Sequence, residues 1–336
     1  MESDPQANVL RLAHIYETGL VLHCLSAVCR LGIPDLLADG RITVSELAAR
    51  SGASEEPLRR VLRFISDHDI VLFDGYTVAL TDLGRLLRKE HPLSMWTSFA
   101  APGPADVAHA IASSLRTGRA AAEEVFHAPF WKYLAAHPAE QDLFDDLMRR
   151  QAQGLALNCI PALAWPGGGT VADVGGGLGL MLAAVLDQDP TLCGILVEQP
   201  QVLKRAREFL SARHLAHRCQ LRHSSLFEPA PPADVYLLSF ILHDWGDKDA
   251  EKILNAVTSN AAENAVLRIF ERLIPEDGRP HASKQFDIGM LLLLGEGRER
   301  TARELEGLLR RTGWEIDEII PAYGTIDMIQ ARRADG

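Results

Sequence analysis

The sequence is poor in cysteine, in positive charge and in long hydrophobic runs. Its five cysteines are odd in number and include no C-x-x-C pair, so we expect free thiols in a reducing compartment rather than a disulfide framework. The 34 lysine and arginine residues are outnumbered by 45 aspartate and glutamate residues. Because the net charge of −11 repels phosphate backbones, nucleic acid is not an expected partner.

Signals for membrane insertion and export are scarce as well. The longest leucine-rich run, residues 288–295, is far shorter than the roughly 20 apolar residues that cross a bilayer. The acidic start Met-Glu-Ser-Asp-Pro lacks the apolar core of a signal peptide. We therefore expect a soluble, cytoplasmic protein with no membrane partner. Its length of 336 residues predicts one large domain or two ordinary ones.

The chain begins with a long apolar stretch. Val9, Leu12, Tyr16 and Leu20 follow the spacing of one helix face, and the pattern predicts a helix over residues 6–31. Beyond Leu20 the stretch is apolar on most sides. We therefore expect this helix to be buried, against a partner subunit.

Two short helices and a hairpin follow. Thr43 and Glu46 have the spacing of a capping box, Ser54 begins a second helix, and Asp74-Gly75 between two apolar runs predicts a hairpin. This order is typical of a winged helix-turn-helix, which raises two interpretations. The first is DNA binding and the second is a dimerisation or lid module.

The charge of this region decides between them. DNA binding would use Arg59, Arg60 and Arg63 on the second helix. However, residues 1–100 carry 10 basic and 13 acidic side chains, and 10 − 13 gives a net charge of −3. A DNA reader needs a basic face. We therefore expect a dimerisation or lid module.

From residue 166 onward the chain alternates strands and helices, which predicts a mostly parallel sheet. A buried strand at 170–174 runs into the glycine-rich turn 173–179, and a later strand ends in Glu198. Glycines let the backbone approach a ligand, and an acid about twenty residues on can hold ribose hydroxyls. A dinucleotide fingerprint starting at Gly175 would need glycine where Leu180 stands. The turn therefore fits a nucleoside without pyrophosphate, with S-adenosylmethionine the common case, although a purely structural turn is the alternative.

A histidine follows a later strand. The strand 234–240 ends just before His243, and the carboxyl end of a strand is where open α/β sheets bind ligands. Histidine is the side chain most easily used as a base near neutral pH. Glu271 and Glu299 are candidates to orient its second ring nitrogen. The alternative for each is a solvated or capping carboxylate.

A second set of histidines invites a metal interpretation. His214, His217, Cys219 and His223 lie close together in the sequence, but they straddle a predicted helix end and a strand and no C-x-x-C supports them. We expect no metal site.

Several motifs together resemble a known family. Asp173-Val-Gly-Gly-Gly-Leu-Gly, Leu-His243-Asp-Trp-Gly-Asp and Gly-Arg-Glu299-Arg-Thr occur in that order, preceded by Phe130-Trp-Lys-Tyr-Leu and the winged module. The chain is similar to small-molecule S-adenosylmethionine-dependent O-methyltransferases of the plant caffeate type and the bacterial polyketide and phenazine type.

The resemblance implies an α/β protein in three parts. Residues 1–100 would be a mostly helical winged-helix dimerisation domain, residues 101–165 a helical bridge that lines the substrate pocket, and residues 166–336 a Rossmann-like catalytic domain. It further implies a homodimer that uses S-adenosylmethionine as cofactor.

The resemblance also assigns roles to side chains. His243 would be the general base, flanked by Glu271 and Glu299. The cofactor would contact a set drawn from the strand ends, namely Asp173, Gly175, Gly177, Glu198, Ser225, Leu226, Phe227 and Ser239. Ser225 stands where the family commonly has aspartate, so the family carboxylate near the adenine is missing.

The acceptor is expected to be a small aromatic molecule with a phenolic hydroxyl. Its apolar walls would be Trp131, Phe144, Met148, Phe240, Met290 and Leu291, and its polar contacts Asn158, Asp244 and Asp287. Two alternatives stay open. One is an enzyme of the same fold that uses the bound sulfonium without methyl transfer, in hydroxylation, decarboxylation or a pericyclic reaction. The other is a winged-helix regulator that senses a small ligand.

Overall fold

The computed structural model describes residues 4–334, and the chain packs as two compact units. The first unit takes the chain up to Ala105 together with His137–Leu147. The second takes Asp106–Ala136 and the chain from Met148 onward. The expected three-part division at residues 100 and 165 stays a prediction.

The first unit is mostly helical. Its helices are α1 (Pro5–Arg30), α2 (Ile33–Leu36), α3 (Val44–Ser51), α4 (Glu55–Ser66), α5 (Asp82–Arg85), α6 (Trp96–Ala100) and the first half of α11 (Pro138–Asn158). Strands β1 (Ile42–Thr43), β2 (Val71–Phe73) and β3 (Thr77–Leu80) form an antiparallel sheet in the order β1-β3-β2. The expected hairpin at Asp74-Gly75 is confirmed, and Gly75 supplies the positive φ of 91° that its turn needs.

Most of helix α1 is exposed within the single chain, and its expected burial against a partner subunit stays a prediction. Val9, Leu12 and Tyr16 are 66%, 68% and 74% exposed within this chain, and only its last turns enter the core through Leu25 and Val28. Within the described chain α1 is also the one helix long and apolar enough to cross a membrane by length and composition. Core helices of water-soluble proteins and signal sequences near an N-terminus pass the same test, so the property assigns no membrane.

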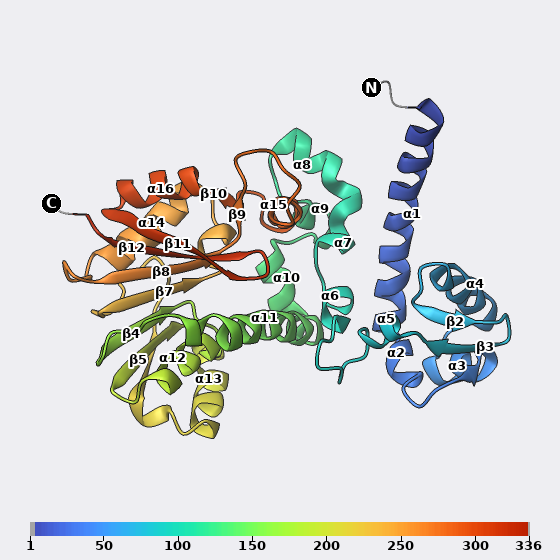
Figure 1. Cartoon of the computed structure of the whole chain (residues 1–336), viewed down its shortest axis with the longest axis horizontal. Coiled ribbons are helices and arrows are strands. Elements are labelled where there is room, and N and C mark those ends of the chain that lie inside the picture. Colours follow the sequence, from blue (N-terminus) through green and yellow to red (C-terminus); the bar gives the residue numbers. More distant parts are fainter. Residues whose placement is uncertain (1–3, 335–336) are drawn as a thin grey trace. The chain divides into compact units, whose positions relative to one another are not determined.

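The second unit is built on a seven-stranded sheet in the order β11-β12-β8-β7-β4-β5-β6 (Figure 1). The strands are β4 (Gly169–Val174), β5 (Leu192–Glu198), β6 (Cys219–His223), β7 (Val235–Ser239), β8 (Val266–Glu271), β11 (Trp314–Tyr323) and β12 (Ile326–Arg333). Neighbours from β6 to β8 are parallel, and β12 and β11 add an antiparallel edge. The predicted α/β class is confirmed.

Helices cover both faces of this sheet. They are α12 (Leu180–Gln188), α13 (Pro200–Ala212), α14 (Asp247–Thr258) and α16 (Ala302–Arg311). Further helices are α7 (Pro104–Val107), α8 (Ile111–Thr117), α9 (Ala121–Phe126), α10 (Phe130–Ala136) and α15 (Ser283–Leu294). Two short strands, β9 (Leu273–Ile274) and β10 (Arg300–Thr301), pair in parallel.

Successive residues of β4 pack into the hydrophobic cores on opposite faces of the sheet. Val171 packs with α12 and α13, whereas Ala172 packs with α14 and α16. Both residues are fully buried, because a parallel strand between two helical layers has no solvent face.

The strand order reverses between β4 and β7. From β4 the chain adds β5 and β6 on one side, and then returns to add β7 and β8 on the other. Open α/β sheets bind ligands at such a switch point, outside the carboxyl ends of the strands. The glycine turn follows β4 and His243 follows β7, so the topology brings both motifs to the same edge.

Candidate active site

His243 lies in a 3₁₀ turn, Leu242–Asp244, directly after β7. The chain enters this turn through Phe240, whose φ of 55° is in the left-handed region that non-glycine residues rarely adopt. The Phe240 ring stacks on the His243 ring with centroids 5.6 Å apart. The reversal at Phe240 thus places the imidazole over the end of the sheet.

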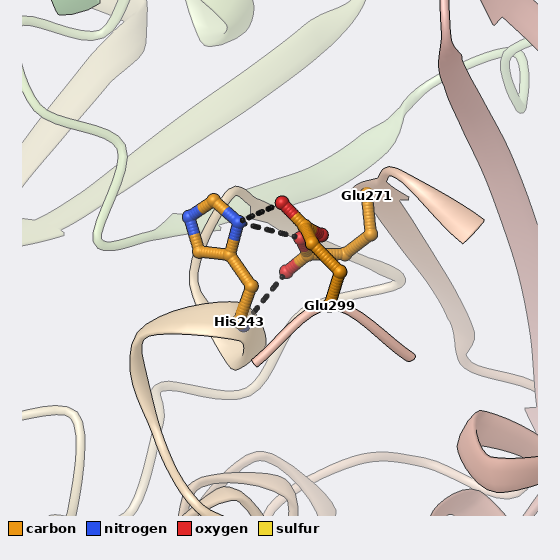
Figure 2. Close-up of side chains that lie close together, drawn as sticks. All are labelled: His243, Glu271 and Glu299. Carbon is orange, nitrogen blue, oxygen red and sulfur yellow. Dashed lines mark hydrogen bonds and ion pairs between the residues drawn. The ribbon is translucent and has the colours of Figure 1, made fainter. Parts of the chain in front are cut away.

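Two buried carboxylates face one nitrogen of this ring (Figure 2). Nδ1 lies 3.2 Å from Oε1 of Glu299 and 3.3 Å from Oε2 of Glu271. Since Nδ1 carries a single proton, we assign its hydrogen bond to Glu299 and regard Glu271 as an ion-pair partner. Neither glutamate engages Nε2, which lies 3.4 Å from Oδ1 of Asp244.

Glu271 also holds the turn that carries His243. Its Oε1 accepts from the backbone N–H of Leu242 at 2.9 Å and from that of His243 at 3.2 Å. Its other oxygen faces the ring, so one carboxylate fixes both the backbone and the side chain of His243. Glu299 is positioned in turn by Asp287, whose Oδ1 accepts from the Glu299 N–H at 3.0 Å.

The electrostatics favour a protonated ring in the free protein. Burial by itself lowers the pKa of His243, but Glu271, Glu299 and Asp244 outweigh burial and raise the pKa to about 9. Burial raises the pKa of Asp244 to about 6. The Asp244 Oδ1 lies 3.4 Å from Nε2, on the side of the ring opposite the glutamates. The ring is therefore strongly basic once it is neutral.

Two arginines near His243 were not predicted from the sequence. The Arg272 guanidinium lies 3.9 Å from the Phe286 ring centroid and 4.7 Å from that of Phe240, and its Nη1 is 3.8 Å from Glu299. Arg300 is 5% exposed and binds the turn beside His243. The available signal was that each directly follows a candidate glutamate in the sequence.

The glycine turn after β4 has the backbone that a close ligand requires. Gly175, Gly177 and Gly179 have φ of 74°, 57° and 80°. A Cβ added at Gly177 would meet no atom within 4 Å, so this part of the turn borders open space. Glu198, at the end of β5, accepts from the Gly177 N–H at 3.3 Å. The turn and the acid thus lie side by side, and their expected contact with a nucleoside stays a prediction.

Asp173 lies beneath this turn and is fully buried. Neither carboxylate oxygen has a hydrogen-bond partner among the described residues. Burial, together with the nearby Glu198, raises the pKa of Asp173 to about 7. The sequence thus places a carboxyl that is costly to ionise under the glycine turn.

The loop after β6 is closed by a carboxylate that the sequence reasoning did not consider. Oε2 of Glu228 accepts from the Ser225 N–H at 2.9 Å and from the Ser224 hydroxyl at 2.8 Å. Leu226 would be 3.3 Å from a Cβ at Gly175, whereas Phe227 is 41% exposed and packs edge-on against Trp245. Ser239 is the partly buried last residue of β7.

The expected acceptor-binding residues are spread more widely. Phe240 contacts the base, as described above. Met290 and Leu291 are partly buried on α15, which packs near the 3₁₀ turn. Trp131 is 45% exposed, and the Asn158 amide donates to the Gly154 carbonyl within α11.

Other expected roles are untested. Asp287 has a protein partner in Glu299, which the sequence did not foresee. Met148 belongs to the second unit, and Phe144 belongs to the first. Their contributions to an acceptor pocket stay predictions.

Metal binding is a second chemistry that His243, Glu271 and Glu299 could support. One ligand atom from each of His243, Glu271 and Glu299 lies within 4.8 Å of the others. The ring-to-carboxylate distances are equally those of hydrogen bonds and ion pairs, which account for the arrangement through proton chemistry alone.

Comparisons with known proteins extend this picture. A model of the O-methyltransferase domain matches residues 108–315, and a model of the O-methyltransferase dimerisation domain matches residues 14–90. The mitomycin biosynthesis 6-O-methyltransferase of Streptomyces lavendulae is 34% identical over 90% of this chain and 88% of its own length. The phenazine O-methyltransferase PhzM of Lysobacter antibioticus is 32% identical over 93% of this chain and 92% of its own.

Solved structures agree with the fold and the cofactor. The mitomycin 7-O-methyltransferase MmcR has a TM-score of 0.89 and 32% identity over 98% of both chains. NcsB1, an O-methyltransferase from neocarzinostatin biosynthesis solved with S-adenosylmethionine and 2-hydroxy-5-methyl naphthoic acid, has a TM-score of 0.83 and 28% identity over 94% of this chain and 96% of its own.

The relatives also include other chemistries. An 8-amino-8-demethylriboflavin N,N-dimethyltransferase of Streptomyces davaonensis is 34% identical over 99% of this chain and 98% of its own length. The aclacinomycin 10-hydroxylase RdmB of Streptomyces purpurascens is 34% identical over 86% of this chain and 80% of its own. Two matching domain models and these full-length relatives establish that the chain belongs to the S-adenosylmethionine-dependent O-methyltransferase family of secondary metabolism, with its dimerisation domain at the N-terminus.

Proposed function

We propose that this protein methylates an aromatic, phenolic hydroxyl of a secondary metabolite, with His243 as general base. The observation that carries the proposal is the His243 ring, whose Nδ1 is held between Glu271 and Glu299 while Nε2, 3.4 Å from Oδ1 of Asp244, pairs with neither glutamate. A phenol has a pKa near ~10, so a base that takes its proton prepares it for attack.

The cofactor supplies a methyl group already activated on a sulfonium. On this chain, Nε2 of His243 accepts the phenolic proton. Glu299 keeps the ring orientation by accepting from Nδ1–H, and Glu271 offsets the positive charge that forms. Oxygen, methyl carbon and sulfur must also lie in line, and holding them so is the other contribution of the protein.

The cofactor contacts follow from the glycine turn. The proposed set begins with Gly175 and Gly177 at the turn, Asp173 beneath it and Glu198 for the ribose hydroxyls. Ser225, Leu226, Phe227 and Ser239 on the neighbouring strand ends complete it. The open space above Gly177 and the adjacent Glu198 carboxylate support this assignment.

The acceptor pocket is proposed on the other side of the base. Phe240, Met290 and Leu291 would contact the aromatic ring, together with Trp131, Phe144 and Met148. Asn158, Asp244 and Asp287 are its proposed polar residues. Asp244 has the most direct support, because its carboxylate lies beside Nε2.

We propose further that the chain acts as a cytoplasmic homodimer. The match of residues 14–90 to a dimerisation domain supports the dimer, and so do the exposed apolar residues of α1. The net charge of −11 supports the proposal that the partners are small molecules rather than nucleic acid.

The test uses S-adenosylmethionine with a radioactive methyl group. Two probes taken from the relatives are 3-amino-4-hydroxybenzoate and 1,4-dihydroxy-2-naphthoic acid. The expected result is a labelled aryl methyl ether with one equivalent of S-adenosylhomocysteine. The first probe carries both a hydroxyl and an amine, so label on nitrogen would contradict oxygen as the acceptor.

The second candidate is a reaction without methyl transfer, which the hydroxylase among the relatives favours. The same assay separates the two functions. Conversion of a probe without release of S-adenosylhomocysteine would replace our proposal with this candidate.

A further inference from the structure

The Arg300 guanidinium donates hydrogen bonds to residues 242–247, the segment that contains His243. Its Nη1 donates to the Leu242 carbonyl and its Nη2 to the Trp245 carbonyl, both at 2.8 Å. Its Nε and Nη2 also donate to Oδ1 of Asp247 at 3.0 and 2.9 Å. The side chain is 4% exposed, so these bonds form away from water.

The neighbours of Arg300 bind the same turn. The Arg298 N–H donates to the His243 carbonyl at 2.7 Å, and the Glu299 carboxylate accepts from the ring. A Cβ on Gly297 would lie 2.9 Å from the His243 carbonyl oxygen, so the two backbones approach closely. The continuous segment 297–300 therefore binds the carbonyl groups of Leu242, His243 and Trp245.

The opposite edge of the turn belongs to Glu271, which accepts from the N–H groups of Leu242 and His243. Loss of Arg300 would free the Leu242 and Trp245 carbonyls, while the Arg298 N–H still held the His243 carbonyl and Glu271 still held the N–H edge. We therefore expect the turn to shift about these remaining bonds, which would move the His243 ring relative to Glu299.

We propose that Arg300 is a positioning residue for the general base: its guanidinium fixes the 242–247 turn so that the His243 ring stays between Glu271 and Glu299. The inference rests on the proposed role of His243. It adds a residue that touches neither the ring nor, by its position, the reacting atoms.

The geometry explains why arginine is required. A planar guanidinium directs several N–H groups at fixed angles, whereas an ammonium group is a compact point charge. Bonds from a charged donor to carbonyl oxygens are also stronger than neutral ones. Lysine at position 300 would retain the charge but could not bind Leu242, Trp245 and Asp247 at once.

The first test is Arg300→Lys, with Arg303→Lys as control, because Arg303 is 81% exposed and pairs only with Glu276 in the described contacts. We expect kcat to fall by about 10²-fold, the loss typical of a misplaced reacting group. We expect the KM for S-adenosylmethionine to stay within twofold. The acid limb of the kcat profile should move to lower pH, because the ring loses carboxylate contact.

The second test avoids a change in the core. Asp247 is 52% exposed, and Asp247→Ala removes two of the four Arg300 bonds. Asp247→Asn removes the same charge but keeps an acceptor oxygen, which makes it the matched control. We expect Asp247→Ala to lower kcat several-fold and Asp247→Asn to remain near the wild type. If Arg300→Lys fails to fold, this pair decides.

A spectroscopic reading needs no acceptor. The proton that Nδ1 shares with a carboxylate gives a far-downfield signal in the proton NMR spectrum, assigned by its loss in His243→Ala. We expect Arg300→Lys and Asp247→Ala to shift or broaden this signal. An unchanged signal together with wild-type kcat and an unchanged acid limb would overturn the inference. Full turnover in His243→Ala would instead overturn the proposed function itself.

Discussion

Nδ1 of His243 lies 3.2 Å from Oε1 of Glu299, across a separation of 56 residues in the chain. The contact joins the turn after β7 to the segment before α16. In the neutral ring a hydrogen bond to Glu299 keeps the proton on Nδ1, which leaves Nε2 as the nitrogen for the proposed role as base.

The first prediction concerns the base itself. His243→Ala should lower kcat by roughly 10²–10⁴-fold, the usual contribution of a general base. Cofactor affinity, measured by calorimetric titration with S-adenosylhomocysteine, should change little. His217→Ala, at an exposed position, is the control. Wild-type turnover in His243→Ala would remove this residue from the mechanism.

The second prediction concerns pH. Because the base must be neutral, kcat/KM of the wild type should rise with pH toward the raised pKa of His243, about 9. Glu271→Gln removes a carboxylate that raises this pKa, so the acid limb should move to lower pH, with a lower maximal rate. Glu276→Gln, at a residue that pairs with Arg303, should leave the limb in place. A limb that did not move would show that another group titrates.

The third prediction concerns the glycine turn. Gly177 and Gly278 both have positive φ, 57° and 75°, and a Cβ at either would meet no protein atom within 4 Å. Alanine should therefore carry a similar backbone cost at both positions, seen as a similar drop in melting temperature. Only Gly177→Ala should also weaken S-adenosylhomocysteine binding, by at least tenfold. Equal affinity in the two variants would mean that the cofactor does not approach Gly177.

The fourth prediction concerns Asp173. Its folded-state pKa is raised to about 7, above that of an unfolded aspartate. The folded state therefore binds the proton more tightly, and this carboxyl destabilises the protein increasingly as pH rises through about 4 to 7. Asp173→Asn should melt at a higher temperature than the wild type at pH 8, with the difference shrinking toward pH 5. A constant difference across this range would contradict the raised pKa.

The fifth prediction concerns α1. Leu12→Glu places a charge on its exposed apolar face, at a side chain 68% exposed in the single chain. If this face lies against a second subunit, the molar mass measured by light scattering should fall toward that of a monomer of 36.9 kDa. Arg11→Glu introduces the same charge at a neighbouring exposed position and is the control. A dimer that survives Leu12→Glu would place the interface elsewhere.

Local sequence patterns were enough to predict the main elements. Alternating strands and helices predicted the parallel sheet, and the position of His243 after a strand predicted its place at the ligand edge. The hairpin at Asp74-Gly75 follows from turn chemistry alone. Each of these predictions depends on neighbours in the chain.

Features that depend on distant segments were not predictable in the same way. The residues alone offered Glu271 and Glu299 as candidates for the second ring nitrogen, and only the resemblance implied that both flank His243. The hydrogen bond from the Glu299 N–H to Asp287 was not foreseen, and the expected contact of Asp287 with an acceptor stays a prediction. The contacts of Arg272 and Arg300 join segments that lie apart in the sequence, and the periodic spacing of apolar residues does not reveal such contacts.

The left-handed φ of Phe240 has a consequence for how this enzyme can vary. Glycine would relax the backbone there, but it would remove the ring that stacks on His243 and lies under Arg272. A β-branched residue would suit neither requirement. Position 240 therefore has two opposed requirements, a low backbone strain energy and an aromatic ring that supports the imidazole. We expect a substitution that relieves the backbone strain to give a more stable protein with a slower reaction.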